Sequence, residues 1–494
     1  MRQANRPTTL GALRRSGYRH RPVKQEVREN LVAALRGGVA IFPGIVGYER
    51  TVIPGVVNAL LAHHDFILLG LRGQAKTRIL RSLVTLLDEE LPVLAGTPLN
   101  DDPFDPVSTT GQRIVAEAGD DAVVEWLPRE ARYNEKLATP DVTIADLIGD
   151  VDPIKAATRK LTYADPEVIH FGIVPRTNRG IFAINELPDL APRIQVGLLN
   201  ILEERDIQVR GFPLRIPLDI LMVFSANPED YTNRGSIITP LKDRISSQVL
   251  THYPKDAETA LTITGQEAWV ERAGPKVVVP REVQLLLEEI SIAARESELV
   301  DQSSGVSARV AIAAQELLVS NLERRALVTG DDPVYPRLAD LHTLLPAITG
   351  KVEMVYEGEQ QGAEMVARTL IGTAIKKFFA ARFPSPGREG EEGLGPYAEI
   401  LAWFAGGNTV MLSDELPHAA YEAELRQVPG LWPLVGDRGR TPQEVAFFAE
   451  LVLDGLHQHL RLAREDVDST VSYREMVKFQ VLRRAARGQD RDAN

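Results

Sequence analysis

Residues 66–77 read Phe-Ile-Leu-Leu-Gly-Leu-Arg-Gly-Gln-Ala-Lys-Thr, and this stretch decides the fold. Four apolar residues lead into a close match to the phosphate-binding template G-x-x-x-x-G-K-S/T, which joins a strand to a helix. Gly70, Lys76 and Thr77 match the template, and Ala75 replaces its last glycine with another small residue. The stretch therefore predicts a strand, a phosphate-binding loop and a helix, in that order.

The predicted loop carries the groups that bind a phosphate chain. Backbone amides of such a loop wrap phosphates at the N-terminus of the following helix. Lys76 would reach the β- and γ-phosphates, and the Thr77 hydroxyl would ligate Mg²⁺. Residues 78–87 have apolar positions at helical spacing, as the template requires. The candidate nucleotide-binding residues of the loop are Gly70, Leu71, Arg72, Gly73, Gln74, Ala75, Lys76 and Thr77.

Composition excludes several classes of protein. The chain has 494 residues, no cysteine and a net charge of −12. The absence of cysteine excludes a disulfide framework and thiolate zinc sites, and the negative charge argues against bulk binding of nucleic acid. No signal peptide is expected, and no apolar stretch is long enough to span a membrane. These features favour a cytoplasmic protein.

Short apolar runs alternate with helical stretches over residues 36–254. The runs at 66–69, 180–184 and 220–225 are almost continuously apolar, as in strands buried on both faces of a parallel sheet. This alternation predicts an α/β domain with a parallel sheet, and nucleotides bind such sheets at the carboxyl ends of the strands.

Polar residues end two of these predicted strands. Asn185 and Glu186 follow the run that starts at Gly180. At such a strand end the first position normally supports Mg²⁺ and the second polarises the attacking water. Glu186 suits the second role, whereas Asn185 stands where an aspartate is usual, so the Mg²⁺ site has lost a charge. Asn227 ends the later run and would orient water against the γ-phosphate, or else be an ordinary turn residue.

Two arginines beyond these strands are candidates for contact with phosphates. Arg244 follows Asn227 and would serve the nucleotide of a neighbouring subunit, as an arginine finger does. Arg309 opens a helix rich in alanine, leucine and valine, from which it would reach the phosphates of its own chain. The alternative for both is an ordinary surface arginine.

The ends of the chain differ from its centre. Residues 1–28 carry seven Arg and one Lys against a single Glu, so residues 1–35 form a basic extension. It is either solvated and flexible or a contact for an acidic partner or nucleic acid. Residues 255–382 have a helical pattern, and residues 383–396 are rich in Gly and Pro, as in a linker. Residues 397–494 predict a small, mainly helical domain, in which Thr441 begins a helix with a capping box.

Taken together, these motifs resemble AAA+ ATPases of the magnesium-chelatase ATPase-subunit and MoxR clade. Besides the motifs above, residues 45–49 resemble the adenine-side box of the family, and residues 199–217 resemble its hairpin insertion. The resemblance covers roughly residues 36–380. It implies an AAA+ parallel-sheet core, a helical lid and a smaller C-terminal domain. It also adds Val46 and Gly47 to the nucleotide site, and makes Asn227 sensor 1, Arg244 the arginine finger and Arg309 sensor 2.

The resemblance implies an ATPase that uses ATP and Mg²⁺ and assembles into a homo-oligomeric ring, commonly a hexamer. It also implies a protein partner with a von Willebrand-type metal-ion-dependent adhesion domain, which the motor would remodel or activate. Metal insertion into a tetrapyrrole is a narrower version of this function. Because Asn185 replaces the usual Asp, the alternative is a nucleotide-bound assembly scaffold that turns ATP over slowly or not at all. No membrane partner is expected, and nucleic acid is not favoured as a partner.

Overall fold

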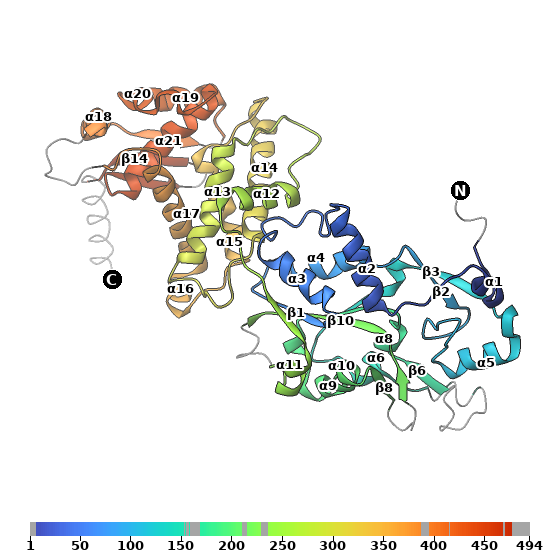
Figure 1. Ribbon diagram of the computed structural model, residues 1–494. Coiled ribbons are helices and arrows are strands. Elements are labelled where there is room, and N and C mark those ends of the chain that lie inside the picture. The colour runs from blue at the N-terminus through green and yellow to red at the C-terminus, as the bar shows by residue number, and fades with distance from the viewer. Residues whose placement is uncertain are drawn as a thin grey trace. The chain divides into compact units, whose positions relative to one another are not determined.

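The computed structural model describes residues 6–152, 154, 158, 168–209, 215–228, 236–386, 395–413, 415–467 and 470–476. The chain divides into two compact units, Met1–Tyr253 and Pro254–Asn494 (Figure 1). Parts of the predicted features lie outside the described residues, namely 1–5 of the basic extension, 210–214 of the hairpin insertion, 387–394 of the linker and 477–494 of the C-terminal domain.

A five-stranded parallel sheet forms the centre of the first unit. Its strand order is β11-β1-β10-β7-β4, so the strand before the phosphate loop lies next to one of the strands that end in a polar residue. The strands are β1 (Phe66–Leu69), β4 (Tyr133–Leu137), β7 (Gly180–Asn185), β10 (Ile220–Ala226) and β11 (Ser247–Leu250). The predicted α/β fold with a parallel sheet is confirmed.

The three central strands are buried on both faces, which explains why their sequences are continuously apolar. Successive side chains of a strand point to opposite faces. Phe66 and Leu68 accordingly belong to one hydrophobic cluster, while Ile67 and Leu69 belong to another. Each cluster is completed by helices that cover that face of the sheet (Figure 1).

One face of the sheet is covered by the helices that flank the phosphate loop in sequence. They are α2 (Val23–Arg36), α3 (Val52–Leu61) and α4 (Lys76–Ser82). The opposite face is covered by helices from the later part of the unit. They are α6 (Ile144–Leu147), α8 (Ile173–Arg176), α9 (Pro192–Gly197), α10 (Leu199–Glu203) and α11 (Thr239–Arg244).

The described residues of the first unit also include three antiparallel strand pairs and the helices α1 (Leu10–Arg15) and α5 (Thr109–Ala118). The pairs join β2 (Glu90–Leu94) to β3 (Val124–Pro128), β5 (Gly149–Val151) to β6 (Ile169–Phe171), and β8 (Asp206–Gln208) to β9 (Arg215–Pro217).

The basic N-terminal segment is part of this unit from residue 6 onward, so a solvated, flexible extension is the wrong interpretation there. Glu26 on α2 is 1% exposed and forms two hydrogen bonds with Arg132, of 2.7 and 2.6 Å. Arg6 binds Glu90, and Arg14 lies 2.5 Å from Asp120. The sequence suggested a free arm because its basic residues have acidic partners far along the chain, which composition does not reveal.

The second unit is built mainly from helices around one hydrophobic cluster. Its first half contains α12 (Ala257–Glu267), α13 (Arg281–Glu296), α14 (Arg309–Thr329), the 3₁₀ helix η8 (Leu338–Leu344), α15 (Leu345–Thr349), α16 (Tyr356–Gln361) and α17 (Ala363–Ala380). Its second half contains α18 (Ala398–Ala405), α19 (His418–Arg426), α20 (Leu431–Val435) and α21 (Pro442–Gln458). The cluster includes residues from both sides of the predicted linker, such as Phe379 and Phe404. The division into lid, linker and C-terminal domain stays a prediction.

The second half also contains an antiparallel sheet that the sequence did not predict. Its order is β12-β14-β13, with β12 (Val410–Ser413), β13 (Leu462–Val467) and β14 (Thr470–Glu475). β13 carries charged side chains such as Arg464 and Asp466, so it lacks the apolar alternation typical of a half-buried strand, whereas Val471 and Tyr473 of β14 do alternate with polar residues. The predicted helix start at Thr441 is confirmed, because its hydroxyl accepts a hydrogen bond of 3.2 Å from the Glu444 amide.

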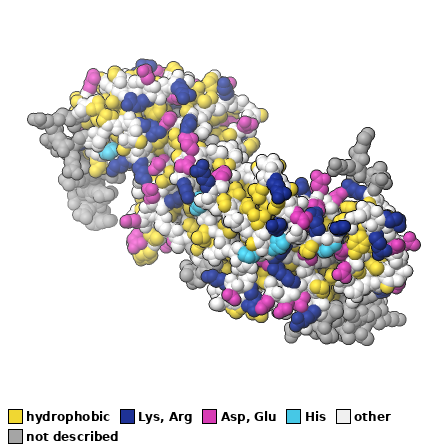
Figure 2. Space-filling model, in the orientation of Figure 1, with side chains coloured by type: hydrophobic (Ala, Val, Ile, Leu, Met, Phe, Trp, Pro, Cys, Tyr) yellow, Lys and Arg dark blue, Asp and Glu magenta, His cyan; other side chains and the backbone are white. Residues whose placement is uncertain are grey.

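Within the described part of the chain, no helix is both long and apolar enough to cross a membrane. Figure 2 shows basic and acidic side chains interspersed over the visible face of each unit. A mixed surface of this kind fits the net charge of −12 better than a concentrated basic footprint would.

Candidate functional site

The phosphate loop occupies its predicted place between β1 and α4. A Cβ added to Gly70 would lie 1.9 Å from Thr251 Oγ1 and 2.2 Å from Gln74 Oε1, so a larger residue there would force these two side chains to move. Ala75, which replaces the template glycine, has φ 56° and ψ 15°. This left-handed conformation favours glycine, so Ala75 holds the loop at some cost in backbone strain. The residue that replaces the template glycine thus adopts a conformation that glycine would adopt more easily.

Lys76 is buried and faces the carboxyl ends of the central strands. Its ammonium donates hydrogen bonds to the carbonyl of Leu71 (3.0 Å), to the carbonyl of Gly70 and to Oδ1 of Asn227 (2.6 Å). The structure thus brings together two predicted site residues that are 151 positions apart. A phosphate bound in the loop would replace some of these oxygens with its own.

A second group of polar side chains lies beside Thr77, at the ends of β7 and β10. Oδ1 of Asn185 accepts hydrogen bonds from the Thr77 hydroxyl (3.4 Å) and the Ser225 hydroxyl (3.1 Å). This group joins the two residues predicted to hold the metal. Ser225 was not predicted, because a buried serine within an apolar run looks like a simple part of the strand.

Glu186 follows Asn185 in a strained conformation. Its φ of 54° and ψ of 50° lie in the left-handed region, which a residue with a Cβ adopts at a cost. Its amide donates a hydrogen bond of 3.3 Å to the hydroxyl of Ser225. Strain of this kind persists only where the surroundings impose it, and it is common at active sites. The residue that the sequence proposed as the water-polarising base is thus one of seven described non-glycine residues with a positive φ.

The segment after β11 braces the phosphate loop. The Thr251 hydroxyl donates to Oε1 of Gln74 (2.6 Å), and the Tyr253 hydroxyl donates to the carbonyl of Arg72 (3.0 Å). These braces were not predicted, since no local pattern marks them. They depend on the parallel pairing of β11 with β1, which brings the end of β11 beside the loop.

The predicted adenine-side residues Val46 and Gly47 precede Tyr48, which ties this segment to the loop. The Tyr48 hydroxyl donates to the carbonyls of Gln74 (3.1 Å) and His252 (2.7 Å). Burial raises the pKa of Tyr48 to about 12, so the hydroxyl stays protonated and keeps donating. Gly47 has φ 83°, a conformation that favours glycine.

Arg244 lies at the end of α11, on the sheet face opposite α4. It donates to Oε2 of Glu203 (2.6 Å) and to the carbonyl of Pro240 (3.0 Å), and its side chain is 29% exposed. Arg309 is the first residue of α14 in the second unit. The phosphate loop, Asn185 and Asn227 thus form one group within the first unit, whereas Arg244 and Arg309 are positioned by other elements.

The residues present suit a magnesium nucleotide. The loop offers backbone amides at a helix N-terminus and a buried lysine, and Thr77 and Asn185 offer neutral oxygens, which are ligands that Mg²⁺ accepts. Among the described residues, no group of three or more His, Cys, Asp or Glu could hold a metal ion. A metal at this site would therefore rely on the nucleotide phosphates as well as on the protein.

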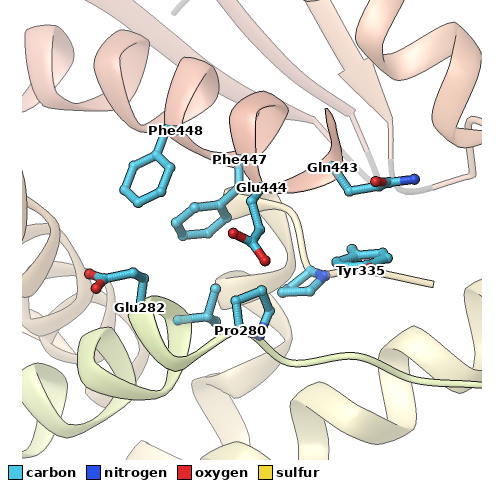
Figure 3. Close-up of a pocket in the computed structure, with 9 residues that line it drawn as sticks. Pro280, Glu282, Tyr335, Gln443, Glu444, Phe447 and Phe448 are labelled. Atoms are coloured by element: carbon cyan, nitrogen blue, oxygen red, sulfur yellow. The ribbon is translucent and has the colours of Figure 1, made fainter. Parts of the chain in front are cut away.

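A hollow in the second unit offers no comparable site. It lies between the N-terminal ends of α13 and α21 and is lined by Pro280, Val283, Tyr335, Phe447 and their neighbours (Figure 3). Its acidic groups are already engaged. Glu282 accepts from Arg382, and Glu444 accepts from the amide of Arg440.

The chain was compared with protein-family models, curated proteins and solved structures. No family model matches it. It is 26% identical over 247 residues to the magnesium-chelatase subunit ChlI of Nostoc sp., covering 49% of this chain and 62% of the relative. It is 26% identical over 323 residues to the chloroplastic subunit ChlI-1 of Arabidopsis thaliana, covering 62% of this chain and 72% of the relative. The chain thus spans less than two thirds of the Nostoc protein that it matches.

Among solved structures, a chain from the complex between subunits BchI and BchD of magnesium chelatase matches with a TM-score of 0.35 and 18% identity. This match covers 65% of this chain and 98% of the other. A TM-score this low adds nothing to the sequence matches, which carry the assignment alone. Those matches bear out the predicted resemblance of this chain to the ATPase subunits of magnesium chelatase.

Proposed function

We propose that this protein is an AAA+ motor that binds ATP with Mg²⁺, hydrolyses it, and works in a ring to remodel or activate a protein partner. One observation carries the proposal. Lys76 of the phosphate loop is bonded to Asn227, beside the group formed by Thr77, Asn185 and Ser225. These side chains meet at the carboxyl ends of parallel strands, where α/β proteins bind nucleotides.

Each residue then has a role that follows from its place. Lys76 and the loop amides bind the phosphates, and Thr77 and Asn185 hold Mg²⁺, which would neutralise charge that develops on the phosphates. Glu186 polarises the attacking water, and Asn227 orients it. Arg244 acts on the nucleotide of the next subunit, because it lies across the sheet from its own loop. Arg309 contributes from the second unit.

The partner and the assembly rest on the family relationship. The proposed assembly is a homo-oligomeric ring, commonly hexameric in the family, and the proposed partner carries a von Willebrand-type metal-ion-dependent adhesion domain. The proposed location is the cytoplasm. Affinity capture from a lysate of the source cells, with and without a non-hydrolysable ATP analogue, would identify proteins that bind only the nucleotide-loaded form.

A second function is favoured by Asn185, which brings no negative charge to the metal. In this alternative the protein binds ATP to close a ring and serves as a scaffold, with little or no turnover. Measurements of phosphate release and of assembly on the purified protein distinguish the motor from the scaffold. Phosphate release that Glu186→Gln abolishes supports the motor, whereas ATP-dependent assembly without phosphate release supports the scaffold. Absence of nucleotide binding, measured by calorimetry, would overturn both.

A further inference from the structure

A carboxylate from the neighbouring strand lies beside Asn185. Glu135 is on β4, which pairs with β7 in the register Glu135↔Ala183 and Leu137↔Asn185. Because side chains two residues apart share a face of a strand, Glu135 and Asn185 project from the same face of the sheet. This is the face that α4 covers, so the carboxylate lies on the side of the phosphate loop.

Glu135 is held in place by two side chains. Arg81 donates from Nε to both carboxylate oxygens, at 3.1 and 3.0 Å, and Tyr133 donates at 3.2 Å. The hydrogen bonds from Arg81 and Tyr133 give the Glu135 carboxylate a fixed orientation.

Asn185 lies between this carboxylate and the phosphate loop. Its Oδ1 accepts from Thr77 and Ser225, and the strand register places its side chain diagonally across from Glu135 on the same face of the sheet. Arg81, which binds Glu135, lies one helical turn after Thr77 on α4. Thr77, Asn185, Glu135 and Arg81 thus lie on the side of the sheet that faces the phosphate loop.

We propose that Glu135 supplies the negative charge that Asn185 lacks at the magnesium site. It would act from beyond Asn185 through its electrostatic field, which Arg81 partly neutralises and which would favour a cation held by Thr77 and Asn185. Glu135 is a positioning residue in this account, and the proposal rests on the proposed function, since it requires a metal nucleotide in the loop.

The exposure of the Arg81 and Glu135 side chains allows an electrostatic role of this ion pair to be distinguished from a role in stability. The Arg81 side chain is 62% exposed and that of Glu135 is 27% exposed. Ion pairs so open to water contribute little to stability. Loss of the ion pair should therefore leave the folded protein intact. A change in metal affinity in such a variant would then be due to the lost charge and not to unfolding.

The test measures metal binding directly. Mn²⁺ replaces Mg²⁺ in the complex of the full-length protein with ADP, and free Mn²⁺ is followed by electron paramagnetic resonance. Glu135→Gln should weaken Mn²⁺ binding about fivefold, because a nearby negative charge is lost. Arg81→Gln should strengthen Mn²⁺ binding about twofold, because it removes a nearby positive charge. Glu29→Gln is the matched control, since Glu29 also pairs with an arginine of the same unit and should change nothing.

Asn185→Asp makes the test sharper. With a carboxylate restored at position 185, Glu135→Gln should cost less than about twofold, or even improve binding by relieving repulsion between two acids. The proposal is overturned if Glu135→Gln changes Mn²⁺ affinity no more than Glu29→Gln does, or if Glu135→Gln and Arg81→Gln shift Mn²⁺ affinity in the same direction. It is also overturned if Glu135→Gln lowers Mn²⁺ affinity by the same factor with and without Asn185→Asp. If the unaltered protein binds no ADP even without metal, the proposed function itself fails.

Discussion

The ammonium of Lys76 lies 2.6 Å from Oδ1 of Asn227, so a single charged hydrogen bond joins the phosphate loop to the end of β10. Lys76 also binds the carbonyls of Gly70 and Leu71, and its side chain is almost wholly buried. The lysine is thus held within the loop by uncharged oxygens. Phosphate oxygens are stronger acceptors for an ammonium than carbonyls are, so nucleotide should displace these contacts.

Lys76→Ala should weaken ATP binding at least about tenfold, which corresponds to roughly 1.4 kcal/mol or more. The reason is the loss of the cation that faces the phosphates. Isothermal calorimetry measures the affinity. Lys377→Ala is the control, because that lysine pairs with Glu296 in the second unit and should leave ATP affinity unchanged. Equal affinities for the unaltered protein and Lys76→Ala would contradict the assignment.

Glu186→Gln should bind ATP normally and lose turnover by about 10²–10⁴-fold, because an amide cannot accept the proton of the attacking water. Phosphate release and calorimetry, run on the same preparation, check the two halves of this prediction. Glu204→Gln is a suitable control, since it changes an exposed acid on a different element. A variant of Glu186 that hydrolyses ATP at the normal rate would show that another group activates water.

Arg244→Ala should retain ATP binding and lose hydrolysis, because a finger of this kind stabilises charge during phosphoryl transfer by about 10³–10⁵ in rate. Mixing it with Lys76→Ala should restore part of the activity. Some interfaces in the mixture would pair an intact loop with an intact finger. Phosphate release from each variant alone and from the mixture is the measurement. Two inactive variants that never complement each other would argue against a shared site.

Ala75→Gly should stabilise the first unit by up to about 1 kcal/mol, because glycine adopts a left-handed conformation without the clash that alanine suffers there. The matched variant is Gly73→Ala. Gly73 has φ 71°, so alanine there should destabilise the unit by a similar amount. Urea denaturation followed by circular dichroism measures both. Shifts of the same sign in the two variants would contradict the strain at Ala75.

Glu450 should make the second unit less stable as the pH rises. Its carboxylate is fully buried and accepts from Leu338 N (2.7 Å), Ala339 N (3.1 Å) and the Tyr421 hydroxyl (2.7 Å). Burial raises the pKa of Glu450 from 4.5 to about 7. A folded pKa above the unfolded one means that the folded state binds the extra proton, so stability is highest below pH 4.5 and falls as the pH passes through 7.

The loss over this range is on the order of 2–3 kcal/mol. Glu450→Gln keeps the shape and removes the titration. Its unfolding free energy should therefore change less between pH 5 and pH 8 than that of the unaltered protein, by about that amount. Urea titrations at the two pH values give the comparison, and an equal pH dependence in both proteins would contradict the prediction.

The sequence predicted features that are written in consecutive residues. The strand, loop and helix around Lys76 follow a template, and the ends of β7 and β10 are marked by a polar residue after an apolar run. Contacts set by strand order were not predictable in this way. Glu135 meets Asn185 only because β4 pairs with β7, and Thr251 reaches Gln74 only because β11 pairs with β1.

The sheet of the second unit and the N-terminal segment were missed for different reasons. The charged side chains of β13 obscure the alternation that reveals a strand, whereas Val471 and Tyr473 of β14 do alternate with polar residues and were overlooked. The arginines of the N-terminal segment look solvated until their acidic partners are brought near by the fold. Those ion pairs join residues far apart in the chain, which no local pattern in a single sequence reveals.

The hydrogen bond from Tyr253 to the carbonyl of Arg72 has a mechanical consequence. Tyr253 is the last residue of the first unit, and the peptide that follows it begins the second. The backbone of the phosphate loop is therefore fastened to the residue at which the first unit ends. A displacement of the loop when nucleotide enters or leaves would strain or break this one hydrogen bond, so the end of the first unit would register the occupancy of the loop.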